Sequence, residues 1–186
     1  MNDTDQRKQL ISPHGTNQVN FAQLHLLSSF NSKGDLPMVE KWLRYPHVAR
    51  WWGNPKEAIT AIRNHDTTAS AIILADSTPI GYLCWQTPTP QELADAGLAD
   101  LPADLVDIDI MIGEPSALGH GYDPEALTQL LAKLRDDGVQ IVGMATAESN
   151  QRARKAFKKA GFRLFRTFTE SGEQMRYLTR EPDAAA

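Results

Sequence analysis

Hydrophobic and polar residues alternate, or recur at helical spacing, along most of the chain beyond residue 18. Alternating stretches predict strands, because successive side chains of a strand point to opposite faces. The predicted strands are Val19–Leu27, Thr68–Leu74, Pro79–Gln86, Leu105–Ile112, Val139–Ala145, Phe162–Thr169 and Glu173–Thr179. Residues 1–18 and 181–186 lack both periods, so we expect loose tails there.

Apolar residues at helical spacing predict four helices between these strands. We expect Asp35 to cap the first helix, Pro46 to end it, and Pro55 to begin the second. The third helix has Ala126, Leu127, Leu130, Leu131 and Leu134 on one face. The fourth helix is basic, with Asn150 as its expected N-cap, and runs through Lys159. The element order is therefore β-α-α-β-β-β-α-β-α-β-β.

This order predicts an α/β fold. Turn residues at 76–79 and at 171–172 predict that the strands on either side of them form two antiparallel hairpins. A chain of 186 residues, 41% hydrophobic and 23% charged, suits a single domain over residues 19–180. No apolar run approaches the ~20 residues of a membrane span, and the N-terminus lacks a signal pattern. A single cysteine, Cys84, excludes an internal disulfide. We therefore expect a cytoplasmic protein with no membrane partner.

The charge pattern bears on the possible ligands. The net charge of −4 argues against a nucleic-acid binder. Five aspartates and no basic residue lie from Asp95 to Asp109, whereas seven basic residues and no acid lie from Arg152 to Arg166. These stretches are either a solvated loop and a solvated helix, or binding surfaces for a cationic substrate and a phosphate-bearing ligand.

A short glycine loop, Gly119-His120-Gly121, lies between a predicted strand and a predicted helix. Its backbone N–H groups and the helix N-terminus can hold a phosphate without a lysine. A tight strand-to-helix turn is the alternative interpretation. No Gly-Lys-Ser/Thr sequence follows, which excludes a nucleoside triphosphate-binding P-loop here.

This loop and the later segment from Asn150 to Ala160-Gly161-Phe162 resemble the GCN5-related N-acetyltransferase (GNAT) superfamily, over about residues 20–180. The resemblance implies the GNAT fold, a mixed, mostly antiparallel central sheet flanked by helices and splayed where acetyl-CoA enters. It also implies that the glycine loop holds the pyrophosphate of acetyl-CoA and that Asn150 contacts its pantetheine arm. The implied acetyl-CoA-binding residues are Met111, Ile112, Leu118, Gly119, His120, Gly121, Tyr122 and Asn150.

Two further stretches bear on the acceptor. The segment His47–Gly53, with adjacent Trp51 and Trp52, resembles the one that borders the antibiotic pocket of aminoglycoside 6′-N-acetyltransferases. Pro79–Tyr82 resembles the third strand of those enzymes. The resemblance implies that Trp51, Trp52 and Tyr82 line the acceptor site. Siderophore lysine-acylating acetyltransferases share the Trp-Trp segment, and a packed helix corner is the structural alternative.

Asp107 and Asp109 alternate with apolar residues along one predicted strand, so they share a face. An ammonium group must lose a proton before its nitrogen can attack a thioester, and a carboxylate can accept that proton. Asp109 matches the catalytic aspartate of the family. Asp107 could bind a second ammonium group, or the two carboxylates could raise one pKa by repulsion. An exposed strand face with no catalytic role is the alternative.

Two departures from the family pattern affect the predicted reaction. Phe157 stands where many members carry the tyrosine that protonates the leaving thiolate. After the predicted strand Val139–Ala145, where some aminoglycoside enzymes have a drug-binding aspartate, the nearest acid is Glu148. No histidine pair has metal-ligand spacing, so we expect no metal.

The sequence therefore predicts direct acetyl transfer from acetyl-CoA to the 6′-amine of an aminoglycoside, a small and polycationic amine. One alternative is a GNAT enzyme for another amine, such as a siderophore lysine precursor or a protein N-terminus. Another is a non-catalytic acyl-CoA-binding module of the same fold. The expected assembly is a monomer or a homodimer.

Overall fold

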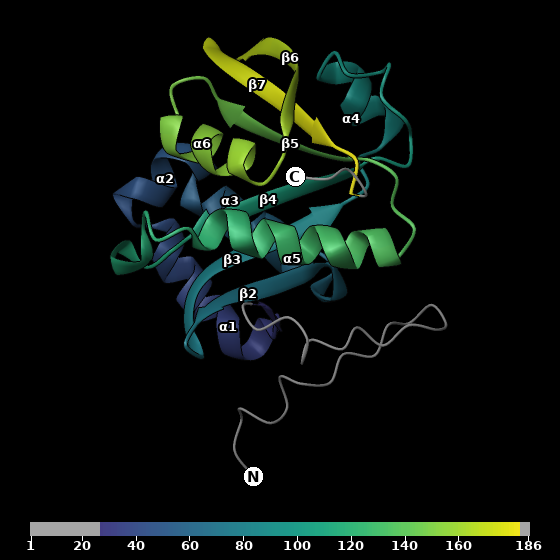
Figure 1. Cartoon of the computed structure of the whole chain (residues 1–186). Coiled ribbons are helices and arrows are strands. Elements are labelled where there is room, and N and C mark those ends of the chain that lie inside the picture. The colour runs from purple at the N-terminus through teal and green to yellow at the C-terminus, as the bar shows by residue number, and fades with distance from the viewer. Residues whose placement is uncertain (1–26, 183–186) are drawn as a thin grey trace. The chain divides into compact units, whose positions relative to one another are not determined.

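The computed structural model describes residues 27–182 (Figure 1). Both predicted tails lie outside this range except for Glu181 and Pro182, and of the predicted strand Val19–Leu27 only Leu27 lies within it. The strands follow the order β1-β2-β3-β4-β5-β7-β6 in a seven-stranded sheet. Strands β4 and β5 pair in parallel, whereas β1–β2, β2–β3, β5–β7 and β6–β7 pair antiparallel. This arrangement confirms the predicted mixed, mostly antiparallel α/β fold.

The strands are β1 (Leu27–Ser29), β2 (Ser70–Ala75), β3 (Thr78–Gln86), β4 (Val106–Ile112), β5 (Val142–Ala147), β6 (Arg163–Glu170) and β7 (Glu173–Arg180). The helices are α1 (Ser32–Leu43), α2 (Pro46–Trp52), α3 (Pro55–Asn64), α4 (Pro90–Asp95), α5 (Tyr122–Asp136) and α6 (Gln151–Lys159). Short 3₁₀ turns occupy Thr67–Ala69 and Pro115–Ala117. Between residues 27 and 182, no helix has the length and apolar character needed to cross a membrane.

The described chain forms two compact units, each built from two segments. The first comprises residues 27–84 and 110–122, and the second comprises residues 85–109 and 123–182. Strand β4 contributes its beginning to the second unit and its end to the first. The single domain over residues 19–180 stays a prediction.

The first helix begins earlier than expected. Asn31, not Asp35, is its N-cap, and the Asn31 side chain accepts hydrogen bonds from the backbone of Lys33 and Gly34. Asp35 lies inside the helix, is buried, and accepts a hydrogen bond from the backbone N–H of Asn31 at 2.8 Å. The prediction was wrong because both residues are good caps, and the residue four positions earlier provides the cap.

Pro46 begins a helix and does not end one. Helix α1 ends at Leu43, and Pro46 is the first residue of α2, a position that suits proline because its missing N–H is not needed there. The predicted start of the next helix at Pro55 is confirmed, with Asn54 as the cap of α3.

The core of the first unit packs helices α1, α2 and α3 together with β2, β3 and the end of β4. It includes the fully buried side chains of Trp42, Leu43, Ile72 and Tyr82. The predicted β2–β3 hairpin is confirmed. Its turn residues Asp76 and Ser77 both adopt positive φ angles of 47° and 67°, as a two-residue hairpin turn requires.

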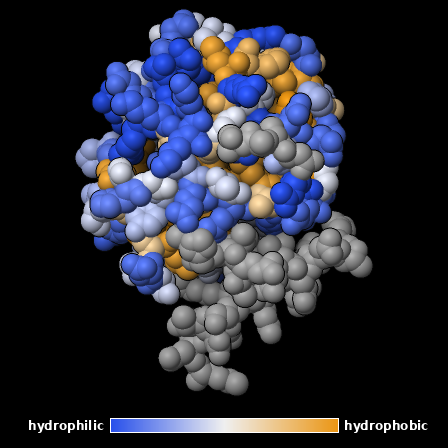
Figure 2. Space-filling model, in the orientation of Figure 1, coloured by the Kyte–Doolittle hydropathy of each residue, from blue (hydrophilic) through white to orange (hydrophobic). Residues whose placement is uncertain are grey.

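The second unit contains the hairpin β6–β7 beside β5, with α6 alongside (Figure 1). Helix α4 begins with a capping box in which Thr89 and Glu92 satisfy each other's backbone N–H groups. A small core joins Leu93, Leu98, Leu101, Leu105 and Tyr177. Apolar side chains also reach the surface between β6 and α4 (Figure 2).

Candidate active site

Strand β4 carries the two candidate carboxylates. Its apolar residues Val106 and Ile108 are buried, whereas Asp107 is half-buried and Asp109 is exposed. This burial pattern confirms the predicted alternation, which sets both carboxylates on the face opposite the buried residues. The more exposed carboxylate is Asp109, the residue that sequence analysis selected as the base.

Asp107 has a defined partner on a distant strand. The hydroxyl group of Tyr177, on β7, donates a hydrogen bond to Oδ1 of Asp107. Gly143, on β5, provides the space for this pair. A Cβ atom at position 143 would lie 2.6 Å from Cζ of Tyr177 and 2.7 Å from Oδ1 of Asp107. Any side chain at position 143 would therefore displace one of the two groups.

Burial, more than charge, sets the pKa values of this pair. Desolvation raises the pKa of Asp107, the hydrogen bond from Tyr177 lowers it, and the charge of Glu92 raises it. Sequence analysis gave repulsion between Asp107 and Asp109 as a possible cause of a raised pKa. In the structure, the pKa of Asp107 is raised by burial and by the charge of Glu92. The pKa of Tyr177 is also raised, first by burial and then by the carboxylates of Asp107 and Asp109. Tyr177 therefore stays protonated and acts as a donor.

The pairing of β4 with β5 ends beside these carboxylates. Val106 pairs with Val142 and Asp107 pairs with Gly143, and the register stops there. Both strands continue, β4 to Ile112 and β5 to Ala147. Main-chain groups of β4 beyond Asp107 therefore have no ladder partner on β5.

The glycine loop belongs to the first unit and leads into α5. Gly119 and Gly121 have φ angles of 80° and 85°, values that residues with a side chain rarely adopt. Apart from its two chain neighbours, no heavy atom of residues 27–182 lies within 4 Å of the place where a Cβ at Gly119 would stand, so the described residues leave the backbone open to a ligand. Nδ1 of His120 lies 3.1 Å from the carbonyl oxygen of Leu118, and the rings of His120 and Tyr122 lie 6.2 Å apart.

The end of β4 is well supported in the same unit. Met111 and Ile112 are buried. Nε2 of His47 lies 3.2 Å from the carbonyl oxygen of Ile112. His47 therefore contacts the end of β4, where Met111 and Ile112 are the residues that sequence analysis assigned to acetyl-CoA binding.

Two residues of α6 were singled out from the sequence. Asn150 is the helix N-cap, and its Oδ1 accepts a hydrogen bond from the backbone N–H of Ala153 at 3.2 Å. Phe157 is buried and its ring lies 6.4 Å from the ring of Phe162. Phe157 is therefore a packing residue, and its side chain has no hydroxyl group to offer a leaving thiolate.

The aromatic residues assigned to the acceptor differ in exposure. Trp51 and Trp52 are partly exposed at the end of α2. The Trp52 ring packs edge-on against Tyr82 with centroids 6.3 Å apart, and the Trp51 ring faces the guanidinium group of Arg50 at 4.5 Å. Tyr82 is fully buried and its hydroxyl oxygen lies 3.0 Å from Oγ of Ser70. The structure thus gives Tyr82 a packing role beside Trp52, and its contact with the acceptor stays a prediction.

Glu148, the acid nearest the end of β5, is engaged by two arginines. Its Oε1 lies 2.8 Å from Nη1 of Arg154 and 3.0 Å from Nη2 of Arg176, and its Oε2 pairs with Nε of Arg176. These contacts lower the pKa of Glu148, with the bond from Arg176 as the largest cause. Glu148 is therefore a poor ligand for an amine of the acceptor.

The second unit thus brings Asp107 close to Glu92, Tyr177 and Gly143, none of which sequence analysis assigned to the site. A glycine inside a predicted strand is the one signal that marked Gly143, because such a glycine often allows a close approach. Within residues 27–182, no three histidine, cysteine or acidic side chains cluster to bind a metal ion.

The sequence model of a family described as "Acetyltransferase (GNAT) domain" matches residues 31–169. No curated protein sequence matches the chain.

Several solved structures share the fold. Aminoglycoside acetyltransferase AAC(6')-Ib, in complex with coenzyme A and kanamycin, is 22% identical with a TM-score of 0.70, over 84% of this chain and 94% of its own. An aminoglycoside N(6')acetyltransferase from Legionella pneumophila is 19% identical with a TM-score of 0.65, over 84% of this chain and 91% of its own. A GNAT-family acetyltransferase from Bacillus anthracis is 12% identical with a TM-score of 0.65, over 86% and 97%.

Proposed function

The chain belongs to the GNAT family of acetyltransferases, and from that premise we propose that it transfers an acetyl group from acetyl-CoA to the 6′-amine of an aminoglycoside. Asp109 is the general base in this proposal, and Asp107 binds a second ammonium group of the acceptor. The transfer is direct, from one bound substrate to the other.

The observation that carries the proposal is the contrast between the two carboxylates of β4. Tyr177 holds the half-buried carboxylate of Asp107 in place. Asp109 is exposed and lies two residues further along the chain, where the pairing of β4 with β5 has ended. A base must reach both solvent and substrate, and Asp109 meets that requirement better than Asp107.

The reaction balances with these groups. The carboxylate of Asp109 accepts a proton from the acceptor's ammonium group, directly or through a water molecule. The amine nitrogen then forms a bond to the thioester carbonyl carbon while the carbon–sulfur bond breaks and the electron pair leaves with sulfur. The second proton of the nitrogen is lost to solvent, and the thiolate of coenzyme A leaves as such or takes a proton from water. No side chain is assigned the role of acid, because Phe157 lacks a hydroxyl group.

The glycine loop suits the pyrophosphate of acetyl-CoA. The positive φ angles of Gly119 and Gly121 and the open space beside Gly119 let phosphate oxygens approach the backbone. The loop leads directly into α5, a helix of 15 residues whose N-terminus favours an anion. Acetyl-CoA, once bound, supplies the activated acetyl group.

The acidic groups near Tyr177 support a polycationic acceptor. Glu92 acts on the pKa of Asp107, and both Asp107 and Asp109 act on that of Tyr177, so three carboxylates share this part of the second unit. Aminoglycosides carry several ammonium groups at neutral pH, which such a field attracts. The solved enzymes of this fold that bind aminoglycosides support the same choice.

The test compares Asp109→Asn with Asp107→Asn, a matched change on the same strand. Thiol release from acetyl-CoA is measured with kanamycin, with N6-hydroxylysine and with no acceptor. We expect release with kanamycin, and a fall in kcat of roughly 10²–10⁴ for Asp109→Asn, with the affinity for acetyl-CoA unchanged. Release with N6-hydroxylysine alone would contradict the aminoglycoside assignment. Full activity of both variants on a verified acceptor would contradict the acid–base mechanism.

A further inference from the structure

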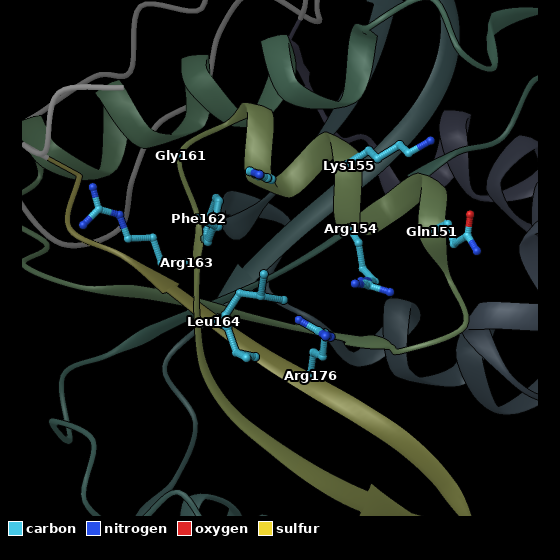
Figure 3. Close-up of a pocket in the computed structure, with 10 residues that line it drawn as sticks. Gln151, Arg154, Lys155, Gly161, Phe162, Arg163, Leu164 and Arg176 are labelled. Atoms are coloured by element: carbon cyan, nitrogen blue, oxygen red, sulfur yellow. The ribbon is translucent and has the colours of Figure 1, made fainter.

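Helix α6 and strands β6 and β7 line a pocket of about 830 Å³ in the second unit (Figure 3). Its volume lies within the range of small-molecule sites. None of the residues that line it has a role in the proposed acyl transfer, and none is acidic. The proposed acyl transfer therefore leaves this pocket without a function.

The lining is strongly cationic. Five of its residues are basic, namely Arg154, Lys155, Lys158, Arg163 and Arg176. Glu148 pairs with two of them, Arg154 and Arg176. Across residues 27–182, the other three make no ion pair within 4.0 Å. One carboxylate thus offsets one of five positive charges, and an excess of positive charge remains.

The two paired arginines are already oriented. In Figure 3 their guanidinium groups point toward the same region, beside Leu164. Their bonds to Glu148 use Nη1 of Arg154 and Nε and Nη2 of Arg176. Among the described residues, no bond uses Nη2 of Arg154 or Nη1 of Arg176. Glu148 therefore holds both side chains in place while N–H groups of each remain for an anion.

The floor of the pocket is apolar. Phe162 and Leu178 line it and are 3% and 6% exposed, whereas Leu164 is 48% exposed. Leu164 and Phe165 are the large hydrophobic residues left exposed in the described part of the chain, and only Leu164 lines the pocket. An apolar group seated on Leu164 would remove this side chain from water, which is favourable.

We infer that this pocket binds a small organic anion that carries an apolar chain or ring, at a site separate from that of acyl transfer. The anionic group, a phosphate, sulfonate or carboxylate, lies against Arg154 and Arg176. The apolar part lies over Leu164. The inference rests on the pocket alone and stands whether or not the proposed acceptor is correct.

The test uses 8-anilinonaphthalene-1-sulfonate, an aromatic sulfonate whose fluorescence rises on binding, titrated into the full chain. Two pairs of variants isolate the pocket. Lys158→Glu changes a lining residue, and Lys159→Glu makes the same change at the next position of α6, outside the pocket. Leu164→Ser and Phe165→Ser form the matched apolar pair. Circular dichroism melts establish that each variant is folded.

We expect saturable binding to one site. Lys158→Glu and Leu164→Ser should each weaken it by about tenfold, while Lys159→Glu and Phe165→Ser should change it by less than about twofold. Octyl phosphate should displace the probe, and octyl glucoside at the same concentration, below the micellar range, should not. The inference would be overturned if the two variants of either pair weakened probe binding equally. It would also be overturned if probe binding did not saturate.

Coenzyme A distinguishes this pocket from the acyl-transfer site. The probe should stay bound when coenzyme A is added at a saturating concentration. Its displacement by coenzyme A would mean that the pocket belongs to the coenzyme A site, and would overturn the inference of a separate site. This outcome leaves the proposed function unaffected, because thiol release with kanamycin tests that independently.

Discussion

Tyr177 donates a hydrogen bond to Asp107 across 70 residues of chain. This bond separates the roles of two carboxylates that the sequence presents as near equivalents. Asp107 is held by a partner and is partly removed from solvent, whereas Asp109 is exposed. In the proposed reaction, the held carboxylate binds charge and the exposed one moves a proton.

Replacing Tyr177 with Phe should move the pH profile of the enzyme. The bond from Tyr177 lowers the pKa of Asp107, so its loss should raise that pKa further. The acidic limb of kcat/KM for kanamycin should therefore move to higher pH, and kcat/KM near neutral pH should fall by roughly 3–30-fold. The KM for acetyl-CoA should not change.

A double-mutant cycle provides the control for this prediction. In an Asp107→Asn background, Tyr177→Phe should have little further effect, because the group that titrates is gone. If Tyr177→Phe moves the acidic limb of the pH profile equally in the wild type and in the Asp107→Asn variant, Tyr177 acts through a different residue.

Replacing Trp52 with Ala should weaken acceptor binding selectively. Aromatic faces attract ammonium groups by ~0.5–2 kcal/mol per contact, so the KM for the acceptor should rise by a few-fold to tenfold, and more than the KM for acetyl-CoA. Trp51→Ala is the matched comparison. Because the Trp51 ring faces Arg50, this change should raise the KM for the acceptor less than Trp52→Ala does. Equal changes in both KM values, or loss of folding, would favour the packed helix corner.

Replacing Gly121 with Val should weaken binding of acetyl-CoA. Gly121 has a φ angle of 85°, which a β-branched residue adopts at a cost of order 1–3 kcal/mol. The new side chain would also crowd the approach of the pyrophosphate. Isothermal titration should show a loss of affinity for acetyl-CoA of about tenfold or more.

Gly172→Val controls for the backbone cost alone. Gly172 has a φ angle of 82° in the β6–β7 turn, and a Cβ placed there would meet no atom of the described residues within 4 Å beyond its chain neighbours. Both variants should therefore lose stability, and only Gly121→Val should lose affinity. Unchanged affinity in a folded Gly121→Val variant would rule out the glycine loop as the pyrophosphate site.

Asp107 should make stability depend on pH in a defined direction. Its pKa in the folded protein is raised above the ordinary 3.8, so folding favours its protonated form. This contribution is complete below the unfolded pKa and is lost as pH rises through the raised folded pKa. Urea unfolding from about pH 3.5 to 7 should show the wild type losing stability relative to Asp107→Asn. A constant difference across this range would mean that Asp107 titrates normally.

Local patterns in the sequence predicted much of this molecule. Alternation predicted the burial along β4, and turn residues predicted the β2–β3 and β6–β7 hairpins. The N-cap at Asn150 followed from its position before a basic helix. Each of these features depends on residues close together in the chain, which is where propensity and periodicity are informative.

Features that depend on distant residues were not predicted. The partner of Asp107 is 70 residues away, and nothing near Tyr177 marks it as a donor to a carboxylate. The ion pairs of Glu148 include Arg176, which lies 28 residues further along the chain on β7. The errors at Asp35 and Pro46 have a different origin, because in each case the local signal suits two structures and the neighbouring residues decide between them.

The missing side chain at Gly143 has a consequence for related sequences. A methyl group there would meet both the Tyr177 ring and the Asp107 carboxylate, so positions 107, 143 and 177 cannot vary independently. A relative with alanine at position 143 should carry a smaller residue at position 177, and one that keeps both Asp and Tyr should keep glycine. A relative that has Asp, Gly and Tyr at positions 107, 143 and 177 should therefore share the hydrogen bond between the tyrosine and the aspartate, and these three positions identify such relatives from sequence alone.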